Sequence, residues 1–127
     1  MKQVLFILLV FISFQGFSQT KTIKLNEIGL EVMTEDLGGG MKISWFEARA
    51  ACERLGRGWR LPTLVELMEK LYPLKDEIGR GNNDSYWSST PWPVGNDRMM
   101  RFNFKKKRWG ANFMFSKAYA FAVRDLE

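Results

Sequence analysis

The stretch Gly58-Trp59-Arg60-Leu61-Pro62-Thr63 separates two helices whose start signals are clear in the sequence. Ser44 and Glu47 have the spacing of a capping box, in which a hydroxyl and a carboxylate satisfy free backbone N–H groups at a helix start. The first helix continues through an alanine-rich segment, and Gly56 is expected to end it. The proline of the quoted stretch then sets a turn before the second helix.

The second helix begins at a capping box of the same spacing, formed by Thr63 and Glu66. Apolar residues follow at helical intervals as far as Leu71. Pro73 prevents the helix from continuing far, because proline lacks a backbone N–H and clashes with the preceding turn.

The rest of the chain is predicted to form β structure. One or two short strands are expected over 23–34, followed by a flexible glycine loop over 38–40. Later elements are predicted as a strand over 86–90, a loop over 91–97, a hairpin with strands over 99–104 and 111–115 joined by a turn over 105–110, and a final strand over 118–124. The predicted fold class is α+β, with two helices packed on a twisted antiparallel sheet and long loops.

The N-terminal residues predict a secretory signal peptide. Lys2 supplies a basic start, and the apolar run over 4–14 has the length of a signal-peptide core and is too short to span a bilayer. Cleavage is expected after Ser18 or, as a close alternative, after Gln19. The chain is therefore expected to comprise a signal peptide over 1–18 and one domain over 19–127, working in the periplasm or outside the cell.

Composition excludes several function classes. The chain has 19 basic and 14 acidic residues and no histidine, so the commonest general base and metal ligand are absent. No phosphate-binding loop, HExxH or CxxC motif occurs. Cys52 is the one cysteine, so it is either buried and inert or free to pair between chains. We expect no metal, no cofactor and no catalytic residues.

Several short motifs occur in an order that is characteristic of one protein family. They are Ser44, Trp45, Ala48, Ala51, Cys52, Leu55 and Gly56, then the quoted 58–63 stretch with Glu66 and Leu67, then Tyr86-Trp87-Ser88-Ser89-Thr90, and finally Ala122-Val123-Arg124. In this order they resemble the DUF1566 or Lcl C-terminal domain family over about Ile28 to Asp125. The resemblance implies a C-type-lectin-like fold, distantly similar to the formylglycine-generating sulfatase-modifying enzymes, found in exported bacterial proteins.

The signature residues themselves are interpreted as scaffold. This structural set comprises Trp45, Trp59, Arg60, Leu61, Pro62, Thr63, Tyr86, Trp87, Ser88, Ser89 and Thr90. Trp59 and Trp87 are expected in the core, Arg60 is expected to pair with a carboxylate or cover a carbonyl, and the hydroxyls are expected to satisfy backbone groups. The signature therefore predicts the fold better than it predicts the function.

The chain departs from the related patterns in ways that bear on function. Members of the family often have a cysteine near the end that is able to bridge to the helix cysteine, and here the matching position is Ala122. The cysteine pair on which formylglycine-generating enzymes depend is therefore missing. The calcium-binding motifs of true C-type lectins do not occur either. Asn82-Asn83-Asp84 and Asn96-Asp97 are better explained as turns.

Two late segments are the candidate binding sites. The first is the loop that follows Pro91, where an indole between two prolines is pre-organised for stacking on a sugar or a peptide. The second is the basic turn of the predicted hairpin, which suits an anionic glycan or membrane surface. The alternatives are partial burial of the indoles and a charged turn that protects a sheet edge. The candidate residues are Trp92, Asn96, Asp97 and Arg98 in the loop, and Lys105, Lys107, Arg108 and Trp109 in the turn.

The sequence thus predicts a non-catalytic exported binding or interaction module. Its partner is expected in the envelope or outside the cell and is either a glycan or a protein. One alternative is an accessory or structural envelope protein that docks on another exported protein, and another is a relative of the formylglycine-generating enzymes. Nucleic acid is not expected as a partner, because the basic run is short and the protein is exported. The protein is not expected to span a membrane, and the sequence does not indicate an oligomeric state.

Overall fold

The computed structural model describes residues 21–81 and 84–127. The predicted signal peptide and its cleavage site lie outside the described residues, as do Asn82 and Asn83. Within the described part of the chain, no helix has both the length and the apolar character needed to cross a bilayer.

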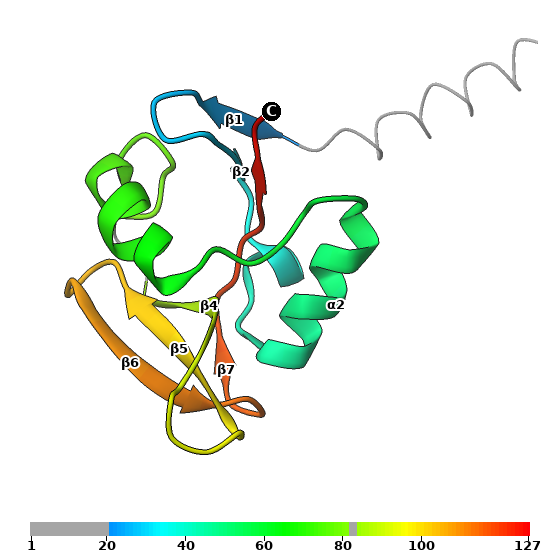
Figure 1. Ribbon diagram of the computed structural model, residues 1–127, viewed down its shortest axis with the longest axis vertical. Coiled ribbons are helices and arrows are strands. Elements are labelled where there is room, and N and C mark those ends of the chain that lie inside the picture. Colours follow the sequence, from blue (N-terminus) through cyan, green and yellow to red (C-terminus); the bar gives the residue numbers. More distant parts are fainter. Residues whose placement is uncertain (1–20, 82–83) are drawn as a thin grey trace, which may run out of the picture.

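The described residues form an α+β fold of short helices and small antiparallel sheets (Figure 1). The coarse fold class predicted from the sequence is therefore confirmed. In chain order the elements are β1 (Thr22–Leu25), β2 (Leu30–Met33), η1 (Leu37–Gly40), β3 (Ile43–Ser44), α2 (Trp45–Leu55), η2 (Glu66–Leu71), η3 (Tyr72–Leu74), β4 (Ser85–Pro91), β5 (Arg98–Asn103), β6 (Arg108–Phe113), β7 (Lys117–Ala118) and β8 (Val123–Asp125).

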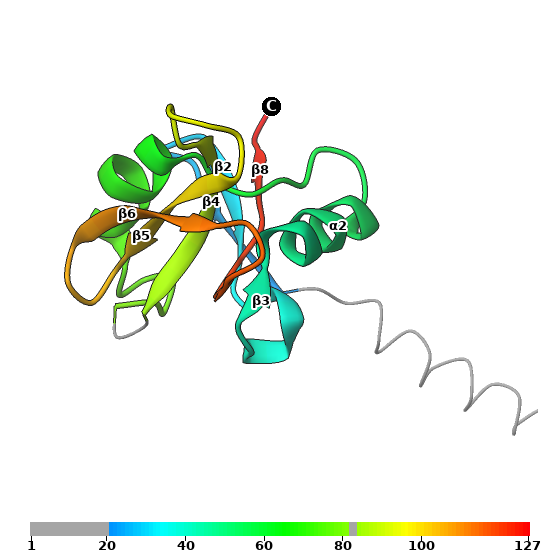
Figure 2. The ribbon, with the colours of Figure 1, turned by 90° about the horizontal axis from the view of Figure 1, so that it is seen from below.

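The strands form three small sheets that lie in different parts of the domain. One sheet has the order β1-β2-β8, so β8 near the end of the chain pairs with β2, and Val123 lies opposite Val32. A second has the order β4-β5-β6, and β3 pairs with β7. Both views show α2 and the β4-β5-β6 sheet on opposite sides of β2 and β8 (Figures 1 and 2). The hairpin of β5 and β6 therefore lies at the rim of the molecule.

The single strand predicted over 118–124 is wrong, because the structure divides it into β7 and β8. Between these strands the chain is held by other partners. Tyr119 forms a parallel bridge to Tyr86, and the Ala122 carbonyl accepts from the Met33 N–H at 3.0 Å. The segment therefore changes sheets as it crosses the core.

The first capping box is confirmed. The Ser44 hydroxyl accepts from the Glu47 N–H at 3.2 Å, and the Glu47 carboxylate accepts from the Ser44 N–H at 3.0 Å. α2 ends where Gly56 takes a φ of 115°, a conformation that residues with a Cβ avoid.

The second capping box is also confirmed, but the helix after it is not α-helical throughout. Thr63 accepts from the Glu66 N–H at 3.1 Å, and Glu66 accepts from the Thr63 N–H at 2.9 Å. η2 is a π-helix whose last turn is closed by the Tyr72 N–H donating to the Leu67 carbonyl, and η3 is a short 3-10 helix. Pro73 offers no N–H at this point, so the regular α pattern cannot continue through it.

The predicted flexible glycine loop is instead a tight turn, η1. Gly38 has a φ of 76°, and a Cβ there would lie 2.7 Å from Cγ2 of Ile43. Glycine is required at this position both by the backbone conformation and by the close approach of the isoleucine.

Two clusters of buried side chains form the core, one beneath η2 and η3 and one between α2 and β4. Trp87 is fully buried in the second cluster, and its indole N–H donates to the Ile43 carbonyl at 2.9 Å. The Trp45 indole N–H donates to the Ser88 carbonyl at 3.0 Å, which ties the start of α2 to β4. Trp59 is only half-buried.

Other signature side chains satisfy backbone groups, as expected. The Ser88 hydroxyl donates to the Met100 carbonyl at 2.8 Å, and the Thr90 hydroxyl accepts from the Leu64 N–H at 3.0 Å. The YWSST segment thus joins β5 on one side and the start of the second helix on the other.

Candidate functional site

The hairpin turn is shorter than predicted and spans Phe104–Lys107. It is closed by the Asn103 side chain, which accepts from the Lys106 N–H at 2.9 Å, and Lys107 takes a φ of 54°. The prediction of a turn over 105–110 is therefore wrong at its far end. Trp109 lies on the strand β6 and not in the turn, because the side-chain bond of Asn103 allows a compact four-residue reversal.

The register of the hairpin places three pairs on one face of the sheet. Trp109 lies opposite Phe102, Ala111 opposite Met100 and Phe113 opposite Arg98. Toward β4 this face is covered, and Phe102 is buried. Along β6 it is open, since Trp109 is 52% and Phe113 48% exposed. We name Arg98, Trp109, Ala111 and Phe113 the hairpin face.

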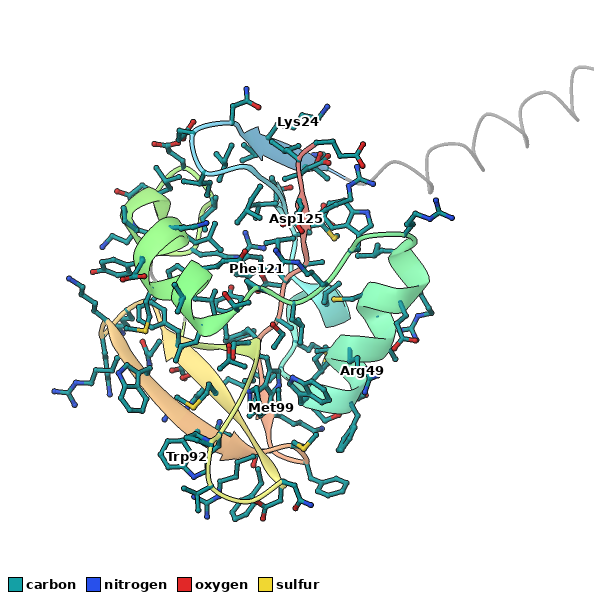
Figure 3. All side chains as sticks on the ribbon, in the orientation of Figure 1. Lys24, Arg49, Trp92, Met99, Phe121 and Asp125 are labelled. Carbon is teal, nitrogen blue, oxygen red and sulfur yellow. The ribbon has the colours of Figure 1, made fainter. Side chains whose placement is uncertain are left out.

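The Trp92 loop borders the hairpin face. The Trp92 N–H donates to the Arg98 carbonyl at 3.2 Å, and the Arg98 guanidinium lies 4.3 Å from the centre of the Phe113 ring. Figure 3 shows Trp92 beside the far end of the hairpin. Its side chain is half-buried, whereas Asn96 and Asp97 are exposed in the loop. The structure does not bring the two predicted candidate segments together: the loop lies at the Arg98–Phe113 end of the hairpin, and the basic turn lies at the opposite end, beyond the pair of Asn103 with Arg108.

Positive charge is concentrated in the hairpin. The segment over 98–117 contains seven basic residues and no acidic residue. Among the described residues, none of these seven has a carboxylate within salt-bridge distance. Exposed members are Arg98, Lys105, Lys106, Lys107, Arg108 and Lys117. The hairpin therefore presents exposed rings beside cations that the protein does not neutralise by contact.

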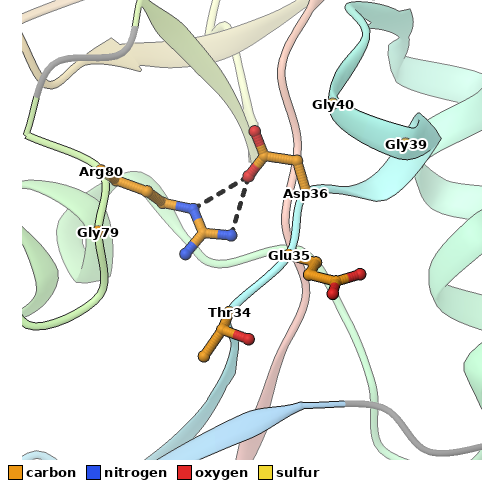
Figure 4. Close-up of a pocket in the computed structure, with 7 residues that line it drawn as sticks. All are labelled: Thr34, Glu35, Asp36, Gly39, Gly40, Gly79 and Arg80. Carbon is orange, nitrogen blue, oxygen red and sulfur yellow. Dashed lines mark hydrogen bonds and ion pairs between the residues drawn. The ribbon is translucent and has the colours of Figure 1, made fainter.

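A cavity of about 380 Å³ beside η1 offers a different environment (Figure 4). Arg80, only 2% exposed, donates to Asp36 Oδ1 through Nη2 at 2.8 Å and through Nε at 3.1 Å. The Tyr86 hydroxyl donates to the other Asp36 oxygen at 2.8 Å, and Arg80 Nη1 donates to the Ile78 carbonyl at 2.9 Å. Arg80 and Asp36 thus neutralise each other at this cavity, and their pairing stabilises the fold.

A second cavity, of about 620 Å³, lies beside the β1-β2-β8 sheet and is lined by another paired arginine. Arg124 donates to Glu31 at 2.7 Å and lies 4.7 Å from the centre of a Trp59 ring. The hydrogen bond from Thr22, followed by those from Arg124, lowers the pKa of Glu31 below its ordinary value. The carboxylate is therefore held in its charged form.

The arginine of the GWRLPT stretch is paired in the same way. Arg60 donates to the two oxygens of Glu66 at 2.8 and 2.9 Å and to Asp125 at 2.7 Å. Burial alone would raise the pKa of Glu66, but the hydrogen bonds from Arg60 and Thr63 hold it below its ordinary value. The expected carboxylate pairing of Arg60 is confirmed.

Cys52 is buried, and burial followed by the nearby charge of Glu53 raises the pKa of its thiol to about 11. A thiol with this pKa carries almost no thiolate at neutral pH. Ala122, the position that matches the second cysteine of the resembling family, is buried in the same core cluster. Among the described residues, no group of histidine, cysteine and carboxylate side chains is arranged to hold a metal ion.

No known family model and no curated protein matches this sequence. Among solved structures, the chain is similar to a chain in the complex of a mutant von Willebrand factor A1 domain with botrocetin. The TM-score is 0.51 at 9% sequence identity, and the match covers 76% of this chain and 91% of the other. Because the identity is so low, the likeness concerns the fold alone.

Sequence reasoning identified Trp92, Arg98, Arg108 and Trp109 but missed Phe113. A signal for Phe113 was present, because Trp109 and Phe113 are four residues apart and therefore share a face of any strand that contains both. Placing Trp109 in the turn concealed that spacing. Two further exposed rings were also missed: Phe115 is 82% and Phe46 43% exposed, and their centres lie 5.3 Å apart.

Proposed function

We propose that this protein is an exported, non-catalytic binding module that recognises an anionic partner through the hairpin face and the adjoining basic turn. The observation that carries this proposal is the pairing of exposed aromatic rings with unneutralised cations on one hairpin. Aromatic rings give a large contact area at low entropic cost, and the cations attract a partner of opposite charge and orient it.

The remainder of the molecule supports a scaffold role. Arg60, Arg80 and Arg124 are paired with carboxylates, and the lone thiol is held protonated by its surroundings. Catalytic groups usually combine a perturbed pKa with access to a substrate. Here each carboxylate with a lowered pKa is already occupied, Glu31 and Glu66 by arginine, Asp84 by Lys42 and Glu47 by the capping box of α2, which favours a binding module over an enzyme.

The resemblance of the sequence to the DUF1566 family supports a more specific fold, and we propose a C-type-lectin-like domain. The helix-WRLPT-helix order, the YWSST strand and a closing strand that pairs with β2 are consistent with that architecture. Such a scaffold presents late loops and strands for recognition while its sheets stay rigid. The similar solved chain comes from a complex between proteins, which fits a module of this kind.

The partner's location follows from the predicted signal peptide. We propose that it lies in the envelope or outside the cell and that the mature protein begins near Gln19. A second candidate role is docking on another exported protein. The observation in its favour is the exposed pair of rings formed by Phe46, at the start of α2, and Phe115.

Fluorescence anisotropy with the mature chain tests the proposed function. Two probes are used: a fluorescein-labelled peptide of alternating glutamate and valine, and fluorescein-labelled heparin as a sulfated glycan. The triple variant Lys105→Glu, Lys107→Glu, Arg108→Glu is expected to have an affinity at least tenfold lower for whichever probe the wild type binds more tightly. The control Arg57→Glu reverses an exposed cation outside the hairpin and is expected to bind as the wild type.

Salt provides a second readout, because raising the ionic strength from about 0.05 to 0.3 M screens exposed charges. The wild-type affinity is expected to fall with added salt. If both probes bind the triple variant as tightly as the wild type, the proposed function is wrong.

A further inference from the structure

β6 is an open edge of its sheet. Within the described residues it pairs with β5 and with no other strand, and the sheet order is β4-β5-β6. Figure 1 shows β6 as the outermost ribbon on its side of the molecule. An edge of this kind presents backbone donors and acceptors that an additional strand is able to use.

The hydrogen-bond pattern shows which backbone groups point outward. The Met114 N–H donates to the Asp97 carbonyl at 3.0 Å, so these residues form a hydrogen-bonded pair at the end of the hairpin. Hydrogen-bonded and non-hydrogen-bonded pairs alternate along an antiparallel ladder. The pairs made by Phe113, Ala111 and Trp109 with β5 are therefore non-hydrogen-bonded, and their N–H groups point toward the open edge.

An independent contact agrees with this assignment. The Arg98 carbonyl accepts from the Trp92 N–H on the β4 side, so it points away from its cross-strand partner Phe113. The Phe113 carbonyl is used by the Ser116 N–H at 2.9 Å. The outward groups left for a partner strand are thus the N–H and carbonyl of Trp109 and Ala111 and the N–H of Phe113.

The opposite face of β6 carries a cationic side chain that reaches across the edge strand. Arg101 of β5 lies opposite Gly110, and a Cβ on Gly110 would be 2.8 Å from Nη2 of Arg101. The glycine therefore allows the guanidinium to lie over β6. Arg101 Nε donates to the Asn112 side chain at 2.9 Å, and the two Nη groups have no hydrogen-bond partner among the described residues. Arg108 lies on this same face and is exposed.

We propose that β6 accepts an extended segment of a protein partner in which acidic and apolar residues alternate. The segment adds a fourth strand to the β4-β5-β6 sheet and pairs with the outward groups of Trp109 and Ala111. Its apolar side chains lie beside Trp109 and Phe113 on the hairpin face, and its acidic side chains face Arg101 and Arg108 on the other. This inference rests on the proposed function and narrows its partner to a polypeptide.

Charge argues against a second copy of this chain as the added strand. Two β6 edges brought together would place two basic turns and two Arg101 side chains in one sheet without a neutralising acid, because the segment over 98–117 contains none. Like charges in neighbouring strands are unfavourable. An acidic strand meets the same edge with opposite charge.

Ala111→Pro is the decisive variant. Proline removes the outward N–H of Ala111 and leaves the hydrogen-bonded pairs between β5 and β6 intact, and an edge strand tolerates proline where the N–H faces solvent. We expect the affinity of this variant for the alternating glutamate-valine peptide, measured by fluorescence anisotropy, to be at least tenfold lower than that of the wild type. The matched variant Ala111→Val also enlarges the side chain but keeps the N–H, and it is expected to bind the peptide more tightly than Ala111→Pro does.

Modified peptides test the same point on the unmodified protein, so the inference does not depend on the proline variant folding. In an added strand, alternate N–H groups of the peptide point toward β6 and the others point away. N-methylation of one alternate set is expected to abolish binding, and N-methylation of the other set is expected to leave it within twofold.

The outcomes separate the two proposals. If Ala111→Pro folds and binds as the wild type, or if both methylated peptides bind equally well, strand addition is wrong. If strand addition fails in this way but the charge-reversed triple variant still loses binding, the proposed function stands without strand addition. If heparin alone binds and the peptide does not, the partner is a glycan and the inference is overturned.

Discussion

The arginines of the core and closing strands differ from those of the β5–β6 hairpin in what they contact. Arg60, Arg80 and Arg124 each donate to a carboxylate at 2.8 Å or less. Arg98 and Arg108 have no carboxylate partner among the described residues and remain exposed. The first group neutralises buried acids and holds the fold together, whereas the second is free to meet a charge from outside. The same residue type thus serves stability in one region and recognition in the other.

The largest effect on stability is expected from Arg80→Ala. Removing the guanidinium takes the ion-pair partner from Asp36, whose side chain is only 11% exposed, and breaking such a buried pair costs about 3–5 kcal/mol. Urea unfolding followed by tryptophan fluorescence measures the change. Arg98→Ala is the matched control from the hairpin and is expected to change the free energy of unfolding by less than about 0.5 kcal/mol. Equal losses in the two variants would remove the distinction between the regions.

A smaller loss of stability, which depends on pH, is expected from Glu31→Gln. The folded pKa of Glu31 lies below its ordinary value of 4.5, so its contribution is present above pH 4.5 and is lost as the pH falls through the folded pKa. The variant is expected to be about 1–2 kcal/mol less stable at pH 7, because hydrogen bonds to a charged acceptor are weakened. Its disadvantage should shrink toward pH 3, as urea unfolding at several pH values measures. A constant difference across this range would contradict the charged pairing of Glu31 with Arg124.

The smallest effect on stability is expected from the hairpin charges. The Lys105→Glu, Lys107→Glu, Arg108→Glu variant alters exposed side chains that have no carboxylate partner among the described residues, so its free energy of unfolding should change by less than about 0.5 kcal/mol. The same variant is expected to lose binding of the acidic peptide. Thermal unfolding by circular dichroism checks the first expectation. A loss above about 2 kcal/mol would show that these cations serve the fold.

Much of the fold was predictable because its decisive signals are local. The two capping boxes each need residues three positions apart, and both helix starts follow from them. The division of the closing segment into β7 and β8 was not predictable in this way. It depends on bridges to Tyr86 and Arg60, which are distant in the sequence.

The candidate site was only partly predictable for a related reason. The aromatic and basic residues were visible in the sequence, but their arrangement depends on the register between β5 and β6. That register follows from the turn, which the Asn103 side chain closes earlier than the sequence suggested. The placement of Arg101 over Gly110 is a cross-strand contact and could not be inferred from either residue alone.

Amide chemical-shift mapping of the ¹⁵N-labelled protein with the alternating glutamate-valine peptide tests the central claim most directly. We predict that the largest shifts fall on the amides of Trp109, Ala111 and Phe113, while the amides around the paired Arg80 and Arg124 change little. Shifts centred on the cavities beside those two arginines, with β6 unchanged, would contradict the account.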